Sequence, residues 1–265
     1  MEITGGESLK HLPSDVLLLI FGKVASHSIE DITNLKLSCW GFYYLAESNY
    51  VYERVSLDKF ALGPLEWVTN AKPFLHRVRV NGSEEEEGEA YYNPDQVYKR
   101  FRQVVFLKRC RDTGNPEVLY REGLVNYSRE TSTADVQALA LHAIKTAAEK
   151  GHHDAKYASS IILMASVDER ERSMGFEFFR SLHDKCLLRP CRQRVRLFIR
   201  LLWVRKEMDY PGIPICNPSI CETRFTEDDH SLSENHEIGN MLGYRVYQRC
   251  KADFEVHLFC IMTLI

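Results

Sequence analysis

The sequence predicts a mainly α-helical protein with a small N-terminal helical module, an α-helical repeat region and a less regular C-terminal segment. Three observations predict this class. A short helix near the N-terminus carries an unbroken run of apolar residues, helix-forming segments recur at a fixed spacing in the middle of the chain, and an arginine-rich amphipathic stretch follows them.

The composition excludes several classes of protein. The chain has 265 residues, of which 45% are hydrophobic, and a formal net charge of −3, so bulk charge gives no attraction to nucleic acid or to an anionic membrane. The acidic N-terminus and the short apolar runs predict neither export nor a membrane span. Eight cysteines without a secretion pattern indicate thiols in a reducing compartment, so we expect the cytoplasm or the nucleus.

The first helix is predicted to begin at Leu12-Pro13-Ser14-Asp15, because proline is tolerated in a first helical turn and Asp15 suits the positive end of the helix dipole. The next six residues, Val16 to Phe21, are all apolar. Six consecutive positions sweep the whole circumference of a helix, so this helix has no polar face before Gly22. Such a helix must be covered on every side.

Two more short helices are expected after it. Ser28 and Asp31 have the spacing of a capping box, an apolar stripe follows, and a third helix is predicted over Phe42 to Glu47. Three short helices of about 45 residues are too few to enclose a helix that is apolar all round, which indicates a partner surface. The alternative is that these residues are the core of a larger helical domain packed on the rest of the chain.

Residues 8–57 resemble an F-box. The resemblance is carried by Leu12-Pro13, the apolar pairs within residues 16–21, the Ser38-Cys39-Trp40 turn, Leu45-Ala46 and the closing residues 51–57. It implies docking onto a Skp1-type adaptor through residues at or near adaptor-facing positions, namely Leu12, Pro13, Leu17, Ile20 and Trp40. The sequence departs from the family at Trp40-Gly41, where a basic residue is usual.

Residues 58–92 are predicted to be a linker. They contain Gly63-Pro64 and then a glutamate-rich run over residues 84–89. Blocks of like charge flanked by glycine are typical of solvated loops, so this segment marks a domain boundary.

A repeat with a period of 37 residues follows over residues 93–186. Gly114 and Gly151 differ by 37 positions, and so do Tyr120 and Tyr157. Helical patterns over residues 97–107, 136–148 and 174–182 keep the same offset at Val104, Leu141 and Phe178. This predicts stacked helical hairpins, with an ordinary helical bundle as the alternative.

Residues 147–157 are similar to the Sel1-like repeat, a relative of the tetratricopeptide repeat. In that motif small residues let paired helices approach, glycine ends one helix, and the tyrosine fills the gap between neighbours. Ser160 stands where that family prefers glycine. An F-box, an acidic linker and Sel1-like helices in this order resemble a group of plant F-box proteins.

The C-terminal segment, residues 187–265, offers two features. Residues 189–206 form a basic amphipathic pattern, which we interpret as a solvated face balanced by the acidic residues 222–237. A zinc site remains an alternative to a purely structural role for five residues: Cys216, Cys221, His230, His236 and Cys250. Residues 254–260 predict a packed terminal element.

The sequence lacks a phosphate-binding glycine loop, a nucleophile elbow and a His-Glu-x-x-His motif. We therefore expect neither catalysis nor a cofactor. The favoured hypothesis is a non-catalytic substrate-recognition subunit of a Skp1-cullin-F-box E3 ubiquitin ligase. Its partners would be the adaptor, through it a cullin, and an unknown protein substrate. The alternatives are a helical-repeat scaffold acting outside a ligase and, more remotely, a zinc-dependent enzyme.

Overall fold

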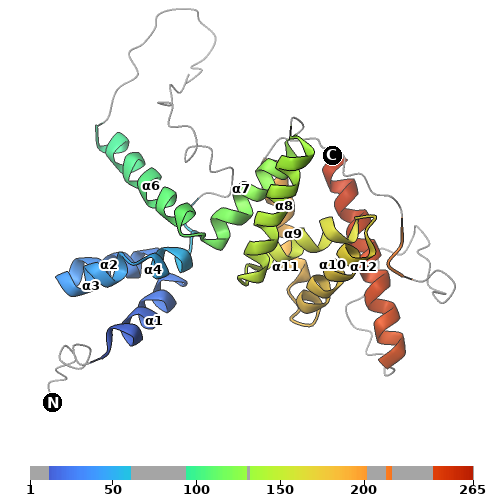
Figure 1. Cartoon of the computed structure of the whole chain (residues 1–265), viewed down its shortest axis with the longest axis horizontal. Coiled ribbons are helices and arrows are strands. Elements are labelled where there is room, and N and C mark those ends of the chain that lie inside the picture. The colour runs from blue at the N-terminus through green and yellow to red at the C-terminus, as the bar shows by residue number, and fades with distance from the viewer. Residues whose placement is uncertain (1–11, 61–93, 130–131, 202–212, 217–240, 265) are drawn as a thin grey trace, which may run out of the picture. The chain divides into compact units, whose positions relative to one another are not determined.

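The computed structural model of the chain describes residues 12–60, 94–129, 132–201, 213–216 and 241–264. The regular structure in these ranges is helical, as the sequence predicted, and comprises eleven helices (Figure 1). They are α1 (Ser14–Ala25), α2 (Ile29–Ser38), α3 (Trp40–Ala46), α4 (Asn49–Arg54), α6 (Pro94–Asp112), α7 (Pro116–Ser128), α8 (Ala134–Glu149), α9 (His153–Met164), α10 (Glu169–His183), α11 (Leu188–Leu201) and α12 (Met241–Leu264).

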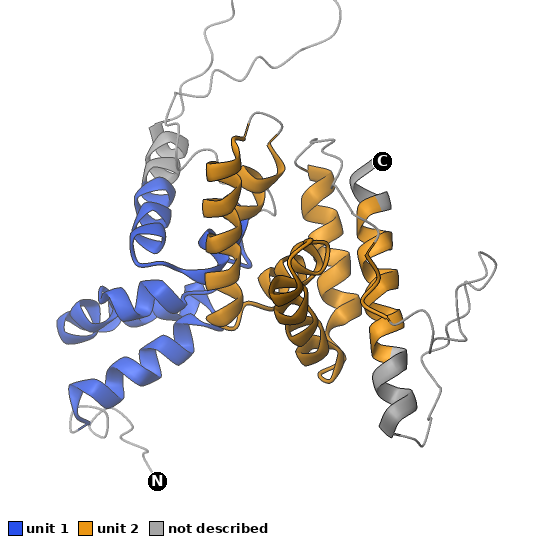
Figure 2. Cartoon of the chain, turned by 45° about the vertical axis from the view of Figure 1, so that its right-hand side comes forward, with its two compact units in different colours: residues 1–121 blue, residues 122–265 orange. Residues whose placement is uncertain are grey.

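The chain forms two compact units, residues 1–121 and residues 122–265 (Figure 2). The division falls inside α7, so α6, which the sequence assigned to the repeat region, belongs to the same compact unit as α1 to α4.

The core of the first unit joins α1 to α4 with α6 and the start of α7. Its buried apolar side chains are Phe21, Ala25, Ile32, Ala46, Val51, Tyr52, Val55, Leu57, Leu107, Cys110 and Val118. Phe21 of α1 meets Phe42 of α3 edge to face, with ring centroids 5.1 Å apart. Leu107 and Cys110 of α6 are completely buried, so α6 supplies part of the cover that α1 to α4 cannot provide by themselves.

Local capping explains where the first helices begin. The Ser28 hydroxyl accepts a hydrogen bond from the Asp31 amide at 3.1 Å, which confirms the predicted start of α2. Helix α3 begins at Trp40, two residues before its predicted start, because Cys39 is extended and closes off α2. Helix α4 was not predicted from the sequence.

The helical hairpins share one turn geometry. Gly114 and Gly151 have φ angles of 71° and 95°, and the amide that follows each glycine donates to a carbonyl five residues back, Asn115 to Cys110 at 2.9 Å and His152 to Ala147 at 3.0 Å. This is the Schellman pattern that glycine favours at helix ends. The prediction that glycine ends the first helix of each hairpin is confirmed.

A third turn has the same hydrogen bond but a different spacing. The Leu187 amide donates to the Leu182 carbonyl at 2.9 Å, and Cys186 takes the left-handed conformation with φ of 56°. Cys186 lies 35 residues after Gly151, whereas the predicted period is 37 residues.

The completely buried apolar positions of the three hairpins follow the same two spacings, 37 residues and then 35. Leu107, Ile144 and Phe179 occupy matching places and are each completely buried, whereas Phe178, which the 37-residue period selects, is half-buried. Adjacent phenylalanines fit the apolar pattern equally well, so only packing could select Phe179.

Helix α9 lies at the centre of the second unit. Helices α8, α10, α11 and α12 all contact it, and every residue from Ala155 to Met164 except Lys156 is buried. Gly175 lets α10 approach closely, because a Cβ atom there would lie 2.8 Å from both the Met164 amide nitrogen and the Ser160 carbonyl oxygen. Ser160 itself is accommodated because its hydroxyl donates to the Tyr157 carbonyl at 2.7 Å.

Helix α12 contains the packed terminal element that the sequence predicted. Val256 and Phe259 are buried in it. Among the described residues, no helix combines the length and the hydropathy needed to cross a lipid bilayer.

Several predicted features lie outside the described residues. They are the Gly63-Pro64 linker, the glutamate run over residues 84–89, the acidic residues 222–237, and Cys221, His230 and His236.

Candidate functional site

The first three helices present large apolar side chains to solvent. On α1, Val16, Leu19 and Ile20 lie on one side, with Leu19 59% exposed, while Phe21 and Ala25 face the core. A helix that is apolar all round therefore divides into a buried side and an exposed side. The sequence predicted a helix that is apolar on every side, and the core of the first unit covers one side of it.

A cluster of three exposed aromatic side chains lies on α3. The rings of Trp40 and Tyr43 stack with centroids 5.5 Å apart, and Tyr44 meets Trp40 edge to face at 5.3 Å. Trp40 is 71% exposed and Tyr44 is 63% exposed. Leu37 at the end of α2 is 80% exposed. We call these residues of α1, α2 and α3 the apolar docking face: Val16, Leu19, Ile20, Leu37, Trp40, Tyr43 and Tyr44.

The five residues predicted from the F-box resemblance do not share one environment. Ile20 and Trp40 lie on the apolar docking face, Pro13 is exposed and Leu12 is half-buried ahead of α1. Leu17 is buried, so a polar substitution there would disturb folding before it reported on any partner.

Five residues of the apolar docking face were not among the predicted adaptor-facing residues: Val16, Leu19, Leu37, Tyr43 and Tyr44. Helix α3 reads Trp-Gly-Phe-Tyr-Tyr-Leu-Ala, so almost every position is apolar. In such a helix the sequence carries no signal that separates the exposed side from the buried one.

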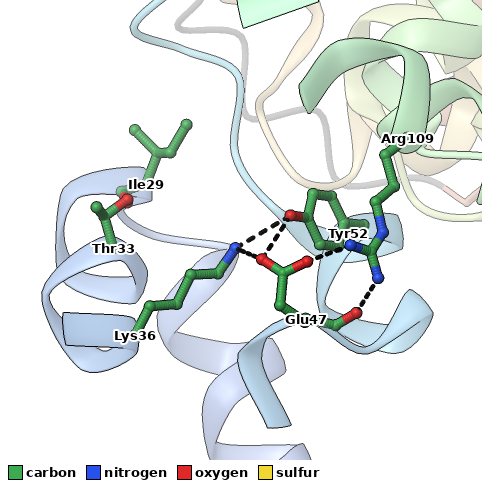
Figure 3. Close-up of polar contacts among 6 residues, drawn as sticks. All are labelled: Ile29, Thr33, Lys36, Glu47, Tyr52 and Arg109. Carbon is green, nitrogen blue, oxygen red and sulfur yellow. Dashed lines mark hydrogen bonds and ion pairs between the residues drawn. The ribbon is translucent and has the colours of Figure 1, made fainter. Parts of the chain in front are cut away.

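A polar cluster holds α2, α3 and α4 onto α6 (Figure 3). Lys36 Nζ donates to Glu47 Oε1 at 2.6 Å and to Tyr52 Oη at 3.1 Å, and Tyr52 Oη donates to the same Glu47 oxygen at 3.0 Å. Arg109 of α6 donates to the other Glu47 oxygen and to the Glu47 main-chain carbonyl. The Arg109 guanidinium also lies 4.2 Å from the centre of the Tyr52 ring.

The pKa values in this cluster follow from its geometry. Burial by itself would raise the pKa of Glu47, but the hydrogen bonds and charges of Lys36, Tyr52 and Arg109 outweigh it, so the pKa is lowered. Burial would likewise lower the pKa of Lys36, yet its bonds to Glu47 and Tyr52 raise it. Both groups are therefore held in their charged forms, which is the arrangement of a structural clamp.

Asn115 makes a second connection inside the first unit. Its buried side-chain amide donates to the Tyr52 and Val55 carbonyls, each at 3.0 Å. These carbonyls end α4 and would otherwise lack helical partners. The first hairpin turn is thereby joined to the last of the four N-terminal helices, which fixes the support beneath the apolar docking face.

The second unit encloses a buried ionic triad. Glu255 of α12 is completely buried and accepts hydrogen bonds from Tyr157 Oη and from Arg192 Nε, both at 2.9 Å. Arg192 forms a further contact to the second carboxylate oxygen. Burial raises the pKa of Tyr157 well above its ordinary value, and the adjacent Glu255 carboxylate adds to this. The repeat tyrosine therefore fills the space between helices, as expected, and also links α9 to α12.

The zinc hypothesis concerns residues that are only partly described. Cys216 and Cys250 are buried, with their Sγ atoms 3.2 Å apart. Asp253 fixes the segment that carries Cys216 by accepting from the Ile215 and Cys216 amides at 2.7 and 2.9 Å. Within the described ranges, no group of three or more potential ligands gathers at one place, so zinc remains a hypothesis.

Two comparisons with known proteins found a match. Residues 93–200 match the family described as plant tetratrico peptide repeats. A protein of Arabidopsis thaliana named "Putative F-box protein" is 26% identical over 174 residues, which is 66% of this chain and 46% of that relative. The chain thus spans about half the length of the relative that it matches. No solved structure matches it. The chain is therefore similar to a plant F-box protein, and its residues 93–200 are similar to a family of plant tetratricopeptide repeats.

Proposed function

We propose that this protein is a substrate-recognition subunit of a Skp1-cullin-F-box E3 ubiquitin ligase and works in the cytoplasm or nucleus. In this proposal the apolar docking face binds a Skp1-type adaptor, and the second unit captures a protein target. The observation that carries it is the exposure of large apolar side chains, above all Leu19 and Trp40, on helices whose other sides already pack into the core of the first unit.

Leaving these apolar side chains in water costs free energy. Apolar surface gains about 25 cal/mol for each Å² removed from water, and contiguous exposed apolar patches mark sites of protein interaction. The clamp of Lys36, Glu47 and Arg109 holds α2 and α3 in place before any partner arrives. A preformed face loses little conformational entropy on binding.

The proposed role needs no reacting group in this chain. A receptor that holds both adaptor and target raises the effective concentration of a target lysine near a charged ubiquitin-conjugating enzyme. The protein would accordingly be a non-catalytic subunit, without a cofactor of its own.

The test is binding of the intact chain to a purified Skp1-type adaptor. Leu19→Asp and Trp40→Asp place charge on exposed side chains and should leave the fold intact. Hot-spot residues, which cluster near the centre of an interface, cost about 2 kcal/mol or more when they are replaced. If Leu19 and Trp40 are such residues, each variant weakens binding by roughly thirtyfold. Val105→Asp is the matched control, because Val105 is 51% exposed on α6 of the same unit.

Two outcomes decide the proposal. If both folded variants bind the adaptor as tightly as the wild type, the apolar docking face is not the adaptor-binding site. If the control Val105→Asp weakens binding equally, the effect is a non-specific one of charge. Adding a cullin to the wild-type complex then separates a ligase subunit from a scaffold that binds the adaptor outside a ligase, since only the former assembles all three proteins.

A further inference from the structure

Helix α11 carries arginines in two different situations. Arg192 pairs with Glu255, and Arg194 makes two hydrogen bonds of 2.7 Å to the Asp154 carboxylate. Arg189, Arg196 and Arg200 are exposed, and no carboxylate in the described part of the second unit lies within ion-pair distance of them. Paired arginines thus hold the helix in place while the others face solvent.

The three exposed arginines form one line. At about 100° per residue, positions 189, 196 and 200 fall within roughly 40° of one another, and they span about 16 Å along the axis. We call Arg189, Arg196 and Arg200 the arginine stripe. Leu197 and Leu201 lie on one flank of the stripe, roughly 80° and 120° from its centre by the same spacing. Their side chains are 52% and 40% exposed.

This arrangement has a specific chemical preference. Three guanidinium groups in a row repel one another, and each presents a planar fork of donors that matches a carboxylate. The leucines alongside offer apolar surface to the same ligand. Because the opposite side of α11 is buried through Val195 and Phe198, the stripe is presented on a rigid support, which limits the entropy lost on binding.

We propose that the arginine stripe binds an acidic segment of the target protein, in which carboxylates alternate with apolar side chains that cover Leu197 and Leu201. This inference rests on the proposed function, since it names the class of target that the second unit captures. Charge complementarity selects the acidic partner, and the exposed leucines select one that also carries apolar residues.

The same observations disfavour nucleic acid as the ligand. The chain has a net charge of −3, and the stripe is short compared with the extended basic grooves that follow a phosphate backbone. The apolar side chains beside it are leucines, which lack the aromatic faces on which bases stack.

The experiment measures fluorescence anisotropy of a labelled peptide with the full-length chain. The probe is a fluorescein-labelled ten-residue peptide of alternating glutamate and leucine, and the uncharged control peptide alternates glutamine and leucine. The variant Arg196→Gln, Arg200→Gln removes two charges from the stripe. The matched control Arg170→Gln, Lys185→Gln removes two exposed charges elsewhere in the second unit.

We expect the glutamate peptide to bind more weakly as salt rises. The stripe variant should lose about five- to tenfold in affinity, as two partly screened charge pairs imply, whereas the control variant should match the wild type. Leu197→Ser should weaken binding about two- to threefold without changing its dependence on salt.

Three results would overturn the inference: equal affinity of the two peptides, equal loss in the two double variants, or tighter binding of a single-stranded oligonucleotide than of the glutamate peptide. The stripe variant is also tested for adaptor binding, which should be unchanged. In the wild-type chain, adaptor binding without any binding of the glutamate peptide would refute the stripe but not the docking face. Loss of adaptor binding in Leu19→Asp bears only on the docking face.

Discussion

The buried triad of the second unit predicts that removing the Glu255 carboxylate is strongly destabilising. In Glu255→Ala the buried Tyr157 hydroxyl and the Arg192 guanidinium lose the acceptor that they share. Breaking a buried ion pair from one side costs about 3–5 kcal/mol. Because the Arg192 side chain is 27% exposed and regains some water, we expect the lower end, about 3 kcal/mol.

The measurement is urea unfolding, monitored by hydrogen exchange of peptides from α9 and α12. Hydrogen exchange is needed because two compact units can unfold in separate transitions, which a single spectroscopic signal would merge. With a slope near 2 kcal/mol per M of urea, the midpoint of the second unit should fall by about 1.5 M. Glu255→Gln, which keeps the shape and one acceptor, should fall by about half as much.

Two further variants test the reasoning. Glu177→Ala removes an exposed carboxylate from α10 of the same unit and should change stability by less than about 0.5 kcal/mol. Adding Arg192→Met and Tyr157→Phe to a Glu255→Leu chain should restore most of the lost stability, because no buried polar group is then left without a partner. A midpoint shift below about 0.3 M in Glu255→Ala would refute the argument that the triad is buried and mutually dependent.

Three further predictions concern single positions. Gly175→Ala should lower the free energy of unfolding by about 2 kcal/mol or more, because the added Cβ would meet main-chain atoms at 2.8 Å. Gly41→Ala should raise it by about 0.5–1 kcal/mol, because the space around Gly41 is open. Thermal unfolding measures both changes. The pKa of Glu47 lies below its ordinary value of 4.5 in the folded state. The stability that the ionised Glu47 gives to the fold is therefore present above pH 4.5 and is lost as pH falls through the folded pKa. Glu47→Gln should flatten this acid dependence of stability in chemical denaturation. Burial raises the pKa of Cys110 to about 12. In native protein at pH 8 a thiol reagent should therefore modify the exposed Cys39 before Cys110. Equal modification rates at the two thiols would contradict the burial of Cys110.

Local features were predictable because local interactions decide them. The Ser28 cap and the glycine turns at Gly114 and Gly151 each depend on residues within about five positions. The period of the third hairpin was not predictable in this way. Phe178 and Phe179 are equally apolar, and only the neighbouring helices decide which of them is buried.

The candidate docking face shows the same limit at a larger scale. That the first helix carries more apolar surface than its module can bury follows from the composition of residues 16–21. Which residues remain exposed depends on contacts with segments far along the chain, such as Leu107 and Cys110 in the shared core. Leu17 was expected on the docking face and is buried, although its sequence neighbourhood does not distinguish it from Leu19.

The sequence by itself determined the helical class, the first helix's surplus of apolar surface and the hairpin turns, because each is encoded in short-range periodicity or in one residue's backbone preference. The tertiary structure decided which side of that helix faces solvent, how Glu47 joins Lys36 to Arg109, and that Glu255 lies between Tyr157 and Arg192. These last contacts join residues separated by between 11 and 98 positions. No local pattern encodes such pairings, since they arise only when packed helices bring distant segments together.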